Sequence, residues 1–334
     1  MAIDLAFIWA VLIAFAVLAY VVLDGFDLGI GILFPLLGGK DNQDTAMNSV
    51  APVWDGNETW LVLGGGGLFA VFPLAYSIVL PALYAPLTAM LLGLILRGVA
   101  FEFRWRTERG KWIWNWAFFV GSVIATLAQG IALGALVQGI KVEGRAYAGG
   151  WYDWLTPFSL ATAIALLIGY ILLGATWLIM KTQGDLQARA FHFAKPGALL
   201  LLAAIAMFSI WTPFLDAKFM ARWFSFPAML YTAPVPLATA YAAWRLVLGL
   251  RRGEESVPFL ATLALFVLCY IGLGISFYPM IVPPTVTIWD AAGPDKSLAF
   301  LLAGAAILIP LILAYTAYGY WVFRGKVMPG GGYH

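Results

Sequence analysis

The chain has 334 residues, of which 63% are hydrophobic and only 11% are charged, and its formal net charge at pH 7 is +2. With a mean hydropathy of +0.89, this composition excludes an ordinary soluble globular domain and indicates an integral membrane protein. The near-neutral charge and the lack of a long basic tract argue against a nucleic-acid partner. The first residues contain neither a basic n-region nor a small-residue cleavage site, so we expect no removable signal peptide.

Apolar segments long enough to cross about 30 Å of hydrocarbon recur along the whole chain. Helices are expected rather than a barrel, because unpaired backbone groups are costly in lipid and the ten-residue alternation of barrel strands is missing. We predict an all-α protein, a single transmembrane helical domain over residues 1–334. Its nine transmembrane helices are expected at residues 7–36, 55–76, 78–101, 114–138, 157–180, 196–215, 223–248, 258–281 and 298–322.

The Lys and Arg residues are unevenly distributed between the two ends of this bundle. Most of the 19 fall on one side if the segments alternate in direction. Because cytoplasmic loops carry an excess of Lys and Arg, the N-terminus is predicted outside, in the periplasm, and the C-terminus in the cytoplasm.

The first apolar segment contains two acids, in the stretch LDGFDLGIG. An aspartate near the centre of a bilayer costs on the order of 2.5 to 3.5 kcal/mol on insertion scales, so this pair must serve a purpose. Asp24 and Asp27 are three residues apart and therefore share one helix face. Gly25 and Gly29, spaced as G-x-x-x-G, would let a neighbouring helix approach the same segment closely.

The second segment begins with a further acidic motif, VWDGNETW, and contains four consecutive glycines at 64–67 that predict a close helix contact. Asp55 could simply cap this helix. Alternatively, Asp24, Asp27, Asp55 and Glu58 lie near one depth on the inner side of the bundle. Such a cluster either pairs with Arg97 of the third segment or conducts protons, because neighbouring carboxylates in a low dielectric raise one another's pKa.

The remaining polar residues of the apolar segments are weaker candidates. Glu102 and Arg104 are expected at the inner interface in a surface ion pair. Gln129 and Gln138 are expected to hydrogen-bond at helix contacts rather than to bind a ligand.

Ligands for a haem or a metal are scarce. The chain has two histidines: His192, expected in a basic inner loop, and His334, the last residue. It contains no C-x-x-C or H-E-x-x-H motif. We therefore predict no metal site, and any redox cofactor is expected in another chain.

Several stretches together resemble subunit II of cytochrome bd-type quinol oxidases. The likeness begins with LDGFDLGIG, APVWDGNETWL and GGGGLFAVFPLAY. It continues through RGVAFEFR, LLGATWLIMKTQGDL, FYPMIVPP, TIWDA and LILAYTAYGYW, and so covers nearly the whole chain. The compact length looks closer to the cyanide-insensitive branch of the family.

This resemblance implies a subunit of a bacterial inner-membrane enzyme that oxidises quinol and reduces O2 to water in the aerobic respiratory chain. The haems, b and d or b only, would belong to a partner, subunit I, and this chain would ligate none. A small single-helix accessory subunit, lipid and a structural quinone are further possible partners, although no quinone-binding residue can be assigned.

The resemblance also implies roles for individual residues. The family's proton path from the cytoplasm runs past the W-D-G-N aspartate, which is Asp55 here, and Asp27 matches a buried family acid. Neighbouring motif positions are occupied by Asp24, Trp54, Asn57 and Glu58; some members carry Gln at the position of Glu58.

Two other interpretations of the same acids stay open. The chain could be a stand-alone proton- or ion-coupled transporter, for which an internal repeat and broken helices are expected. It could also be a scaffold subunit whose acids only pair with Arg97 and with a partner.

Overall fold

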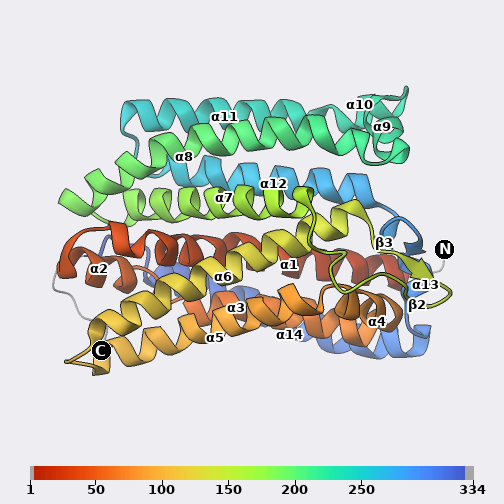
Figure 1. Ribbon diagram of the computed structural model, residues 1–334, viewed down its shortest axis with the longest axis horizontal. Coiled ribbons are helices and arrows are strands. Elements are labelled where there is room, and N and C mark those ends of the chain that lie inside the picture. Colours follow the sequence, from red (N-terminus) through yellow and green to blue (C-terminus); the bar gives the residue numbers. More distant parts are fainter. Residues whose placement is uncertain (1–3, 328–334) are drawn as a thin grey trace.

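The computed structural model describes residues 4–327, which form a bundle of long helices lying side by side with two short β-hairpins at one end (Figure 1). The α-helices are α1 (Leu5–Leu33), α2 (Gly39–Asn48), α3 (Trp54–Val71), α4 (Pro73–Ala82), α5 (Tyr84–Arg106), α6 (Lys111–Gln138), α7 (Pro157–Lys181), α8 (Gly184–Trp211), α9 (Ala217–Phe224), α10 (Ala228–Thr232), α11 (Pro234–Arg252), α12 (Val257–Phe277), α13 (Ile288–Ala291) and α14 (Asp295–Val322). Two 3₁₀ turns, η1 (Phe34–Leu36) and η2 (Thr212–Phe214), follow α1 and α8. The hairpins pair β1 (Val142–Glu143) with β2 (Ala146–Tyr147) and β3 (Met280–Val282) with β4 (Val286–Thr287), both antiparallel.

Between residues 4 and 327, eight helices are long and apolar enough to cross a membrane, or nine if the bent pair α3 and α4 counts as one span. The predicted all-helical membrane architecture is therefore confirmed.

The bend between α3 and α4 corrects one predicted boundary. The two axes differ by 120°, and the break falls at Phe72, whose φ of −121° and ψ of 63° are not helical. The cause is Pro73, because a proline disfavours the helical conformation of the residue before it. The predicted division between residues 76 and 78 was wrong, since α4 turns aside and the next long helix begins at Tyr84.

The sixth segment also begins earlier than predicted. α8 extends back to Gly184 instead of starting at residue 196, because its first turns are amphipathic and hydropathy alone does not detect them. His192 therefore lies on a helix, with its side chain exposed, and not in a loop.

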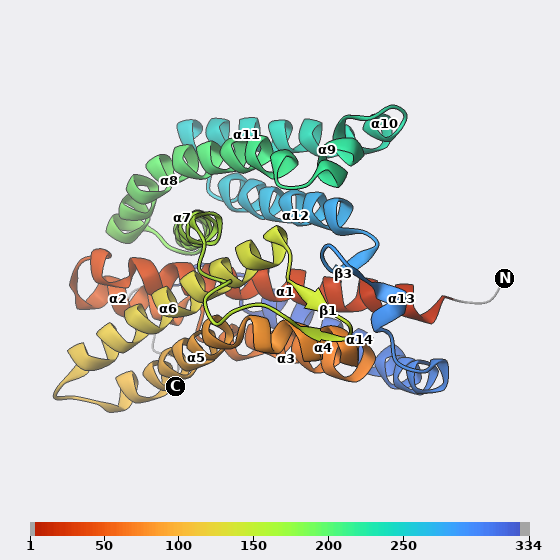
Figure 2. The same cartoon turned by 45° about the vertical axis from the view of Figure 1, so that its right-hand side comes forward.

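α7 lies in the middle of the bundle, with α8, α11 and α12 on one side and α1 and α3–α6 on the other (Figure 2). Its approach to α1 depends on glycine. A Cβ at Gly29 would lie 1.8 Å from the backbone oxygen of Tyr170, and one at Gly25 would lie 2.8 Å from the Tyr170 ring. Only a residue without a side chain permits this contact.

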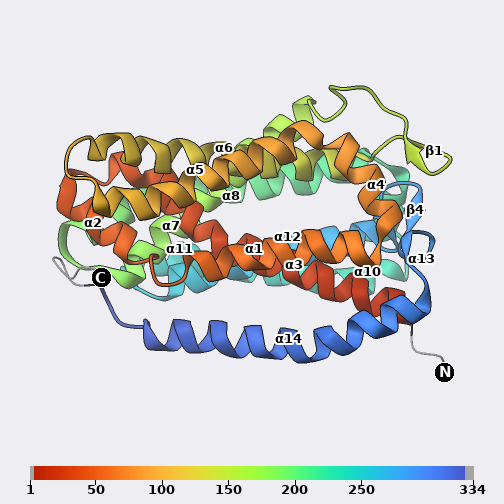
Figure 3. The ribbon, with the colours of Figure 1, turned by 90° about the horizontal axis from the view of Figure 1, so that it is seen from below.

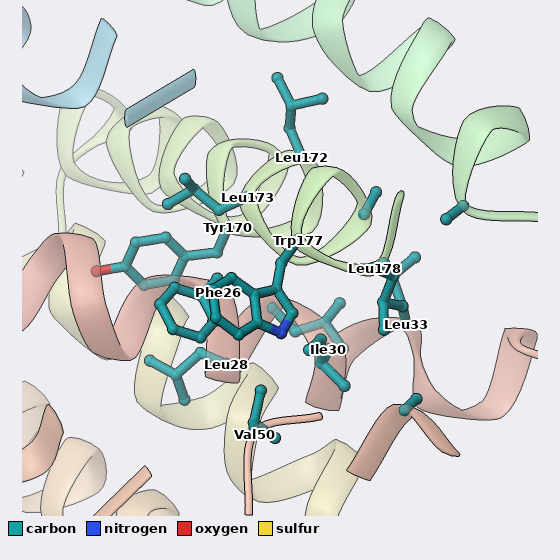
Figure 4. Close-up of a cluster of buried hydrophobic side chains, with 14 of the residues drawn as sticks. Phe26, Leu28, Ile30, Leu33, Val50, Tyr170, Leu172, Leu173, Trp177 and Leu178 are labelled. Carbon is teal, nitrogen blue, oxygen red and sulfur yellow. The ribbon is translucent and has the colours of Figure 1, made fainter. Parts of the chain in front are cut away.

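The largest hydrophobic cluster extends from α5 and α6 across α1 and α7 to α8, α11 and α12, and Figure 4 shows the part between α1 and α7. At its centre Phe26 stacks on Trp177 with ring centroids 4.2 Å apart, and the side chains of Leu173, Leu178 and Leu33 surround the pair. This packing fixes the rotation of α1 and so decides which way its two acids point.

α14 runs along the edge of the bundle (Figure 3). Near one end, Trp9 Nε1 donates to Leu298 O at 3.1 Å. At the other end, Lys181 Nζ donates to the backbone oxygens of Phe323 and Gly325. Both ends of α14 are thus held by hydrogen bonds to the backbone.

Candidate functional site

Asp24 and Asp27 are fully buried, and each faces a polar partner from another helix. Arg97 of α5 meets Asp24, and Asn57 of α3 meets Asp27. The position of Arg97 follows from glycine packing at the same level: a Cβ at Gly121 of α6 would lie 2.9 Å from the Arg97 backbone nitrogen. α5 and α6 are therefore in close contact at the depth of the acids.

Arg97 bridges two carboxylates. Its Nη1 lies 2.7 Å from Asp24 Oδ1, and its Nη2 donates to Glu58 Oε1. Arg97 and Asp24 are completely buried, whereas the Glu58 side chain keeps 25% of its surface exposed. The cluster thus extends from the protein interior to an accessible carboxylate on α3.

Asn57 joins three helices. Its Nδ2 donates to Asp27 Oδ2 at 2.8 Å and to Leu23 O at 3.1 Å, and its Oδ1 accepts from the Tyr320 hydroxyl of α14 at 2.9 Å. Tyr320 was not among the site residues predicted from the sequence. It lies within the closing motif LILAYTAYGYW, but no local pattern indicates which helix it contacts.

A second polar chain continues from the cluster between α1, α6 and α7. Gln129 Nε2 donates to the Tyr20 hydroxyl at 2.8 Å, and Gln129 Oε1 accepts from the Tyr170 hydroxyl at 2.9 Å. Gln129 is thus a helix-contact residue, as predicted. Tyr20 was missed, although its position four residues before Asp24 places it on the same helix face.

Several buried polar atoms of the cluster make no well-aligned hydrogen bond to any described residue. They are Asp24 Oδ2, Asp27 Oδ1 and Arg97 Nε, whereas Asp24 Oδ1 and Arg97 Nη1 form the 2.7 Å ion pair. A buried polar atom left without a partner costs about 1–3 kcal/mol. The arrangement therefore favours a water molecule at Asp24 Oδ2 and Asp27 Oδ1, beside the Asp24–Arg97 ion pair.

Asp55 differs from the other three predicted acids because its side chain is exposed. It is not the N-cap of α3, which is Val53, so the predicted N-cap position was wrong. Asp55 lies in the first turn, where its charge faces the positive end of the helix dipole, and Glu58 lies one turn further on. The adjacent Trp54 stacks on Phe101 with ring centroids 4.7 Å apart, which anchors the motif against α5.

Arg104 corrects a further expectation. It is completely buried rather than at the surface, and it donates to Asp44 of α2 and Asn115 of α6, both at 2.6 Å. Glu102 is exposed and is not its partner. Arg104 thus joins α2, α5 and α6 at the end of the bundle nearest the acid cluster, a role that sequence analysis missed.

Histidine and clustered metal ligands are scarce among residues 4–327. Residues 4–327 contain no group of three His, Cys, Asp or Glu side chains that could bind a metal. A haem in a protein is usually held by a buried His or Met axial ligand, but His192 is exposed on α8. His334 lies outside the described residues.

These features define a multi-pass helical membrane protein with a buried, ion-paired acid cluster. The chain belongs to the family of cytochrome bd terminal oxidase subunit II, whose sequence model matches residues 5–323. It is therefore a subunit of a bacterial respiratory oxidase complex, and this implies a subunit I partner.

Individual relatives agree over almost the whole chain. The cytochrome bd-I ubiquinol oxidase subunit 2 of Escherichia coli K12 is 30% identical, with 97% of this chain and 95% of the relative covered. The cytochrome bd ubiquinol oxidase subunit 2 of Bacillus subtilis is 27% identical, with 96% of each covered. In the solved bd oxidase of Geobacillus thermodenitrificans, one chain has the same fold, with a TM-score of 0.75, 19% identity, and 97% of this chain and 100% of that chain covered. These relatives do not resolve a cyanide-insensitive branch, so that subtype stays a prediction.

Proposed function

We propose that this chain is the non-haem-ligating subunit II of a quinol:O2 oxidoreductase and that it supplies cytoplasmic protons for O2 reduction through Asp24, Asp27 and Glu58. One observation carries the proposal: Arg97 connects the partly exposed Glu58 to the fully buried Asp24. Reduction of O2 to water consumes protons, and carboxyls at graded depth are the side chains that carry them through an apolar bundle. Asp55, exposed at the start of α3, is the group nearest the aqueous surface.

Each residue of the cluster has a distinct role in this proposal. A guanidinium keeps its protons at any physiological pH, so Arg97 holds the carboxyls in place and does not carry protons itself. The carriers are Glu58, Asp24 and Asp27, with water at the buried atoms that lack a protein partner. Asn57 fixes one oxygen of Asp27 and leaves the other, Oδ1, free to exchange a proton.

The proposed orientation has the N-terminus outside and the C-terminus in the cytoplasm. Its support is the uneven distribution of Lys and Arg. In the structure, α2, the turn between α5 and α6, and the end of α14 gather at one end of the bundle, opposite the N-terminal end of α1 (Figure 1). Arg104, Lys111, Lys181 and Lys326 lie at that end. The whole chain then acts as a single transmembrane helical domain.

The haem-bearing subunit I, with haems b and d or b only, is the proposed partner. Two of the four consecutive glycines of α3, Gly65 and Gly66, support this partner, because a Cβ at either position would meet open space. The other two, Gly64 and Gly67, pack against Val17 and Ile13 of α1. Small residues on an outward face suit close packing by a helix of another subunit.

A scaffold role is the second candidate, and the same ion pairs favour it. A buried Arg between two carboxylates can serve the fold without moving any proton. The stand-alone transporter is disfavoured by the family to which the chain belongs.

The replacement Asp27→Asn in the assembled oxidase separates the two remaining functions. If Asp27 carries protons, quinol oxidase turnover falls at least about tenfold, while haem content per complex is unchanged. Asp185→Asn is the control, because it removes an acid from the exposed Arg189 pair and not from the cluster. Full turnover in Asp27→Asn would refute proton supply by this residue, and lost haem or lost assembly would favour the scaffold.

A further inference from the structure

A cavity of about 190 Å³ lies at the end of the bundle that holds the C-terminal ends of α7 and α14. It is separate from the acid cluster, and its walls come from three places in the chain. The lining residues are Ser49, Pro52 and Val53 before α3, Trp177, Met180 and Lys181 of α7, and Tyr320, Phe323 and Arg324 around the end of α14.

The charge of this cavity is positive. Lys181 and Arg324 both line it, and none of the described lining residues is acidic. Lys181 is only 5% exposed, and among the described residues no carboxylate lies within ion-pair distance of its ammonium group. Its partners are instead the backbone oxygens of Phe323 and Gly325 and the ring of Trp177, whose centroid lies 5.3 Å from Lys181 Nζ. A buried ammonium without a counter-ion is costly.

Donor groups remain available for an anion. The Lys181 ammonium has three N–H groups, and the described contacts use two of them. Arg324 Nη1 donates to Trp321 O at 2.7 Å, which leaves its other N–H groups free. The hydroxyl of Ser49 accepts from Trp177 Nε1 at 3.2 Å and so forms a fixed polar wall.

We propose that this cavity binds a phosphate group. Its size suits one phosphate with accompanying water, since a water molecule occupies about 30 Å³ of liquid volume. Lys and Arg are the side chains that bind phosphate, Lys as a point charge and Arg through parallel N–H groups. The positive lining also disfavours proton uptake through this cavity.

Two sources share this chemistry: the headgroup of an anionic phospholipid and free inorganic phosphate. The cavity lies next to exposed aromatic side chains, Trp321 and Phe323, at the end of a membrane-spanning helix. This location suits a headgroup whose acyl chains remain in the bilayer.

A bound phosphate would also act on the acid cluster. Tyr320 lines the cavity and donates to Asn57, which in turn donates to Asp27. By holding the ends of α7 and α14 together, the anion would keep Tyr320 in position.

The test uses the assembled oxidase in nanodiscs of phosphatidylcholine, with or without phosphatidylglycerol, and in phosphatidylcholine with added inorganic phosphate. Thermal unfolding is measured for the wild type, Arg324→Gln and the control Arg252→Gln. Arg252 is also an exposed arginine near the end of a membrane helix, with only a distant contact at 4.0 Å to Glu254. Native mass spectrometry counts retained lipid.

We expect phosphatidylglycerol to raise the unfolding temperature of the wild type and of Arg252→Gln. Phosphatidylglycerol should bind Arg324→Gln at least about tenfold more weakly than it binds the wild type. A rise with inorganic phosphate alone would assign the site to free phosphate. Lys181→Gln, measured in the same way, should lose the response to either probe. The proposal is overturned if neither probe stabilises the wild type, or if Arg324→Gln responds as strongly as the wild type.

Discussion

Replacing Arg97 tests whether the buried carboxylates depend on one positive charge. Arg97→Gln removes the only basic group of the described cluster and leaves the fully buried Asp24 without compensation. Two unit charges 4 Å apart interact by about 4 kcal/mol at an effective dielectric constant of 20. Removing one partner of a buried pair costs about 3–5 kcal/mol, because the other charge stays buried. We therefore expect a loss of about 3–5 kcal/mol in the free energy of unfolding.

The matched control is Arg189→Gln. Arg189 Nε also lies 2.8 Å from a carboxylate, that of Asp185, but the two side chains are 46% and 66% exposed. Such an exposed i,i+4 pair contributes only about 0.3–0.5 kcal/mol. Both changes replace Arg by Gln on a helix, so the difference between their losses of stability reports the effect of burying the ion pair.

The assay is an SDS unfolding titration of the purified complex, with the double variant Arg97→Gln/Asp24→Asn included. Neutralising Asp24 as well should recover most of the lost stability, because Glu58 can turn its partly exposed carboxylate toward water. The reasoning is refuted if Arg97→Gln costs no more than Arg189→Gln, or if the double variant is no more stable than Arg97→Gln alone.

Two further predictions concern helix contacts and pH. Gly29→Ala should lower the unfolding temperature of the complex, because the new Cβ would lie 1.8 Å from a backbone oxygen of α7 and overpacking costs about 1–3 kcal/mol; Gly197→Ala, whose Cβ would make an ordinary contact at 3.7 Å, should not. Equal unfolding temperatures for the two variants would contradict the close crossing. Hydrogen bonds from the Phe7 backbone and then from Trp289 lower the pKa of Asp4, so its contribution to stability is present above about pH 4 and is lost as the pH falls through the lowered pKa. The unfolding temperature of Asp4→Ala should therefore lie below that of the wild type at pH 7, and the gap should close in acid; a gap that persists unchanged at pH 3 would count against this clamp.

The sequence by itself determined the class of protein and most of its helices. Hydropathy and segment length are local properties, and they were sufficient to predict an all-helical membrane protein. The spacing of Asp24 and Asp27, and of Gly25 and Gly29, is also local, because residues three or four apart share a helix face whatever surrounds them.

Only the tertiary structure decided which of these residues meet. Arg97 and Arg104 lie two turns apart on α5, yet one pairs with Asp24 and Glu58 and the other with Asp44. Local sequence could not predict this difference, because each partner comes from another helix whose rotation is set by distant packing, such as the stack of Phe26 on Trp177. The burial of Arg104 and the contact of Tyr320 with Asn57 were decided in the same way, since both follow from how the helices pack on one another.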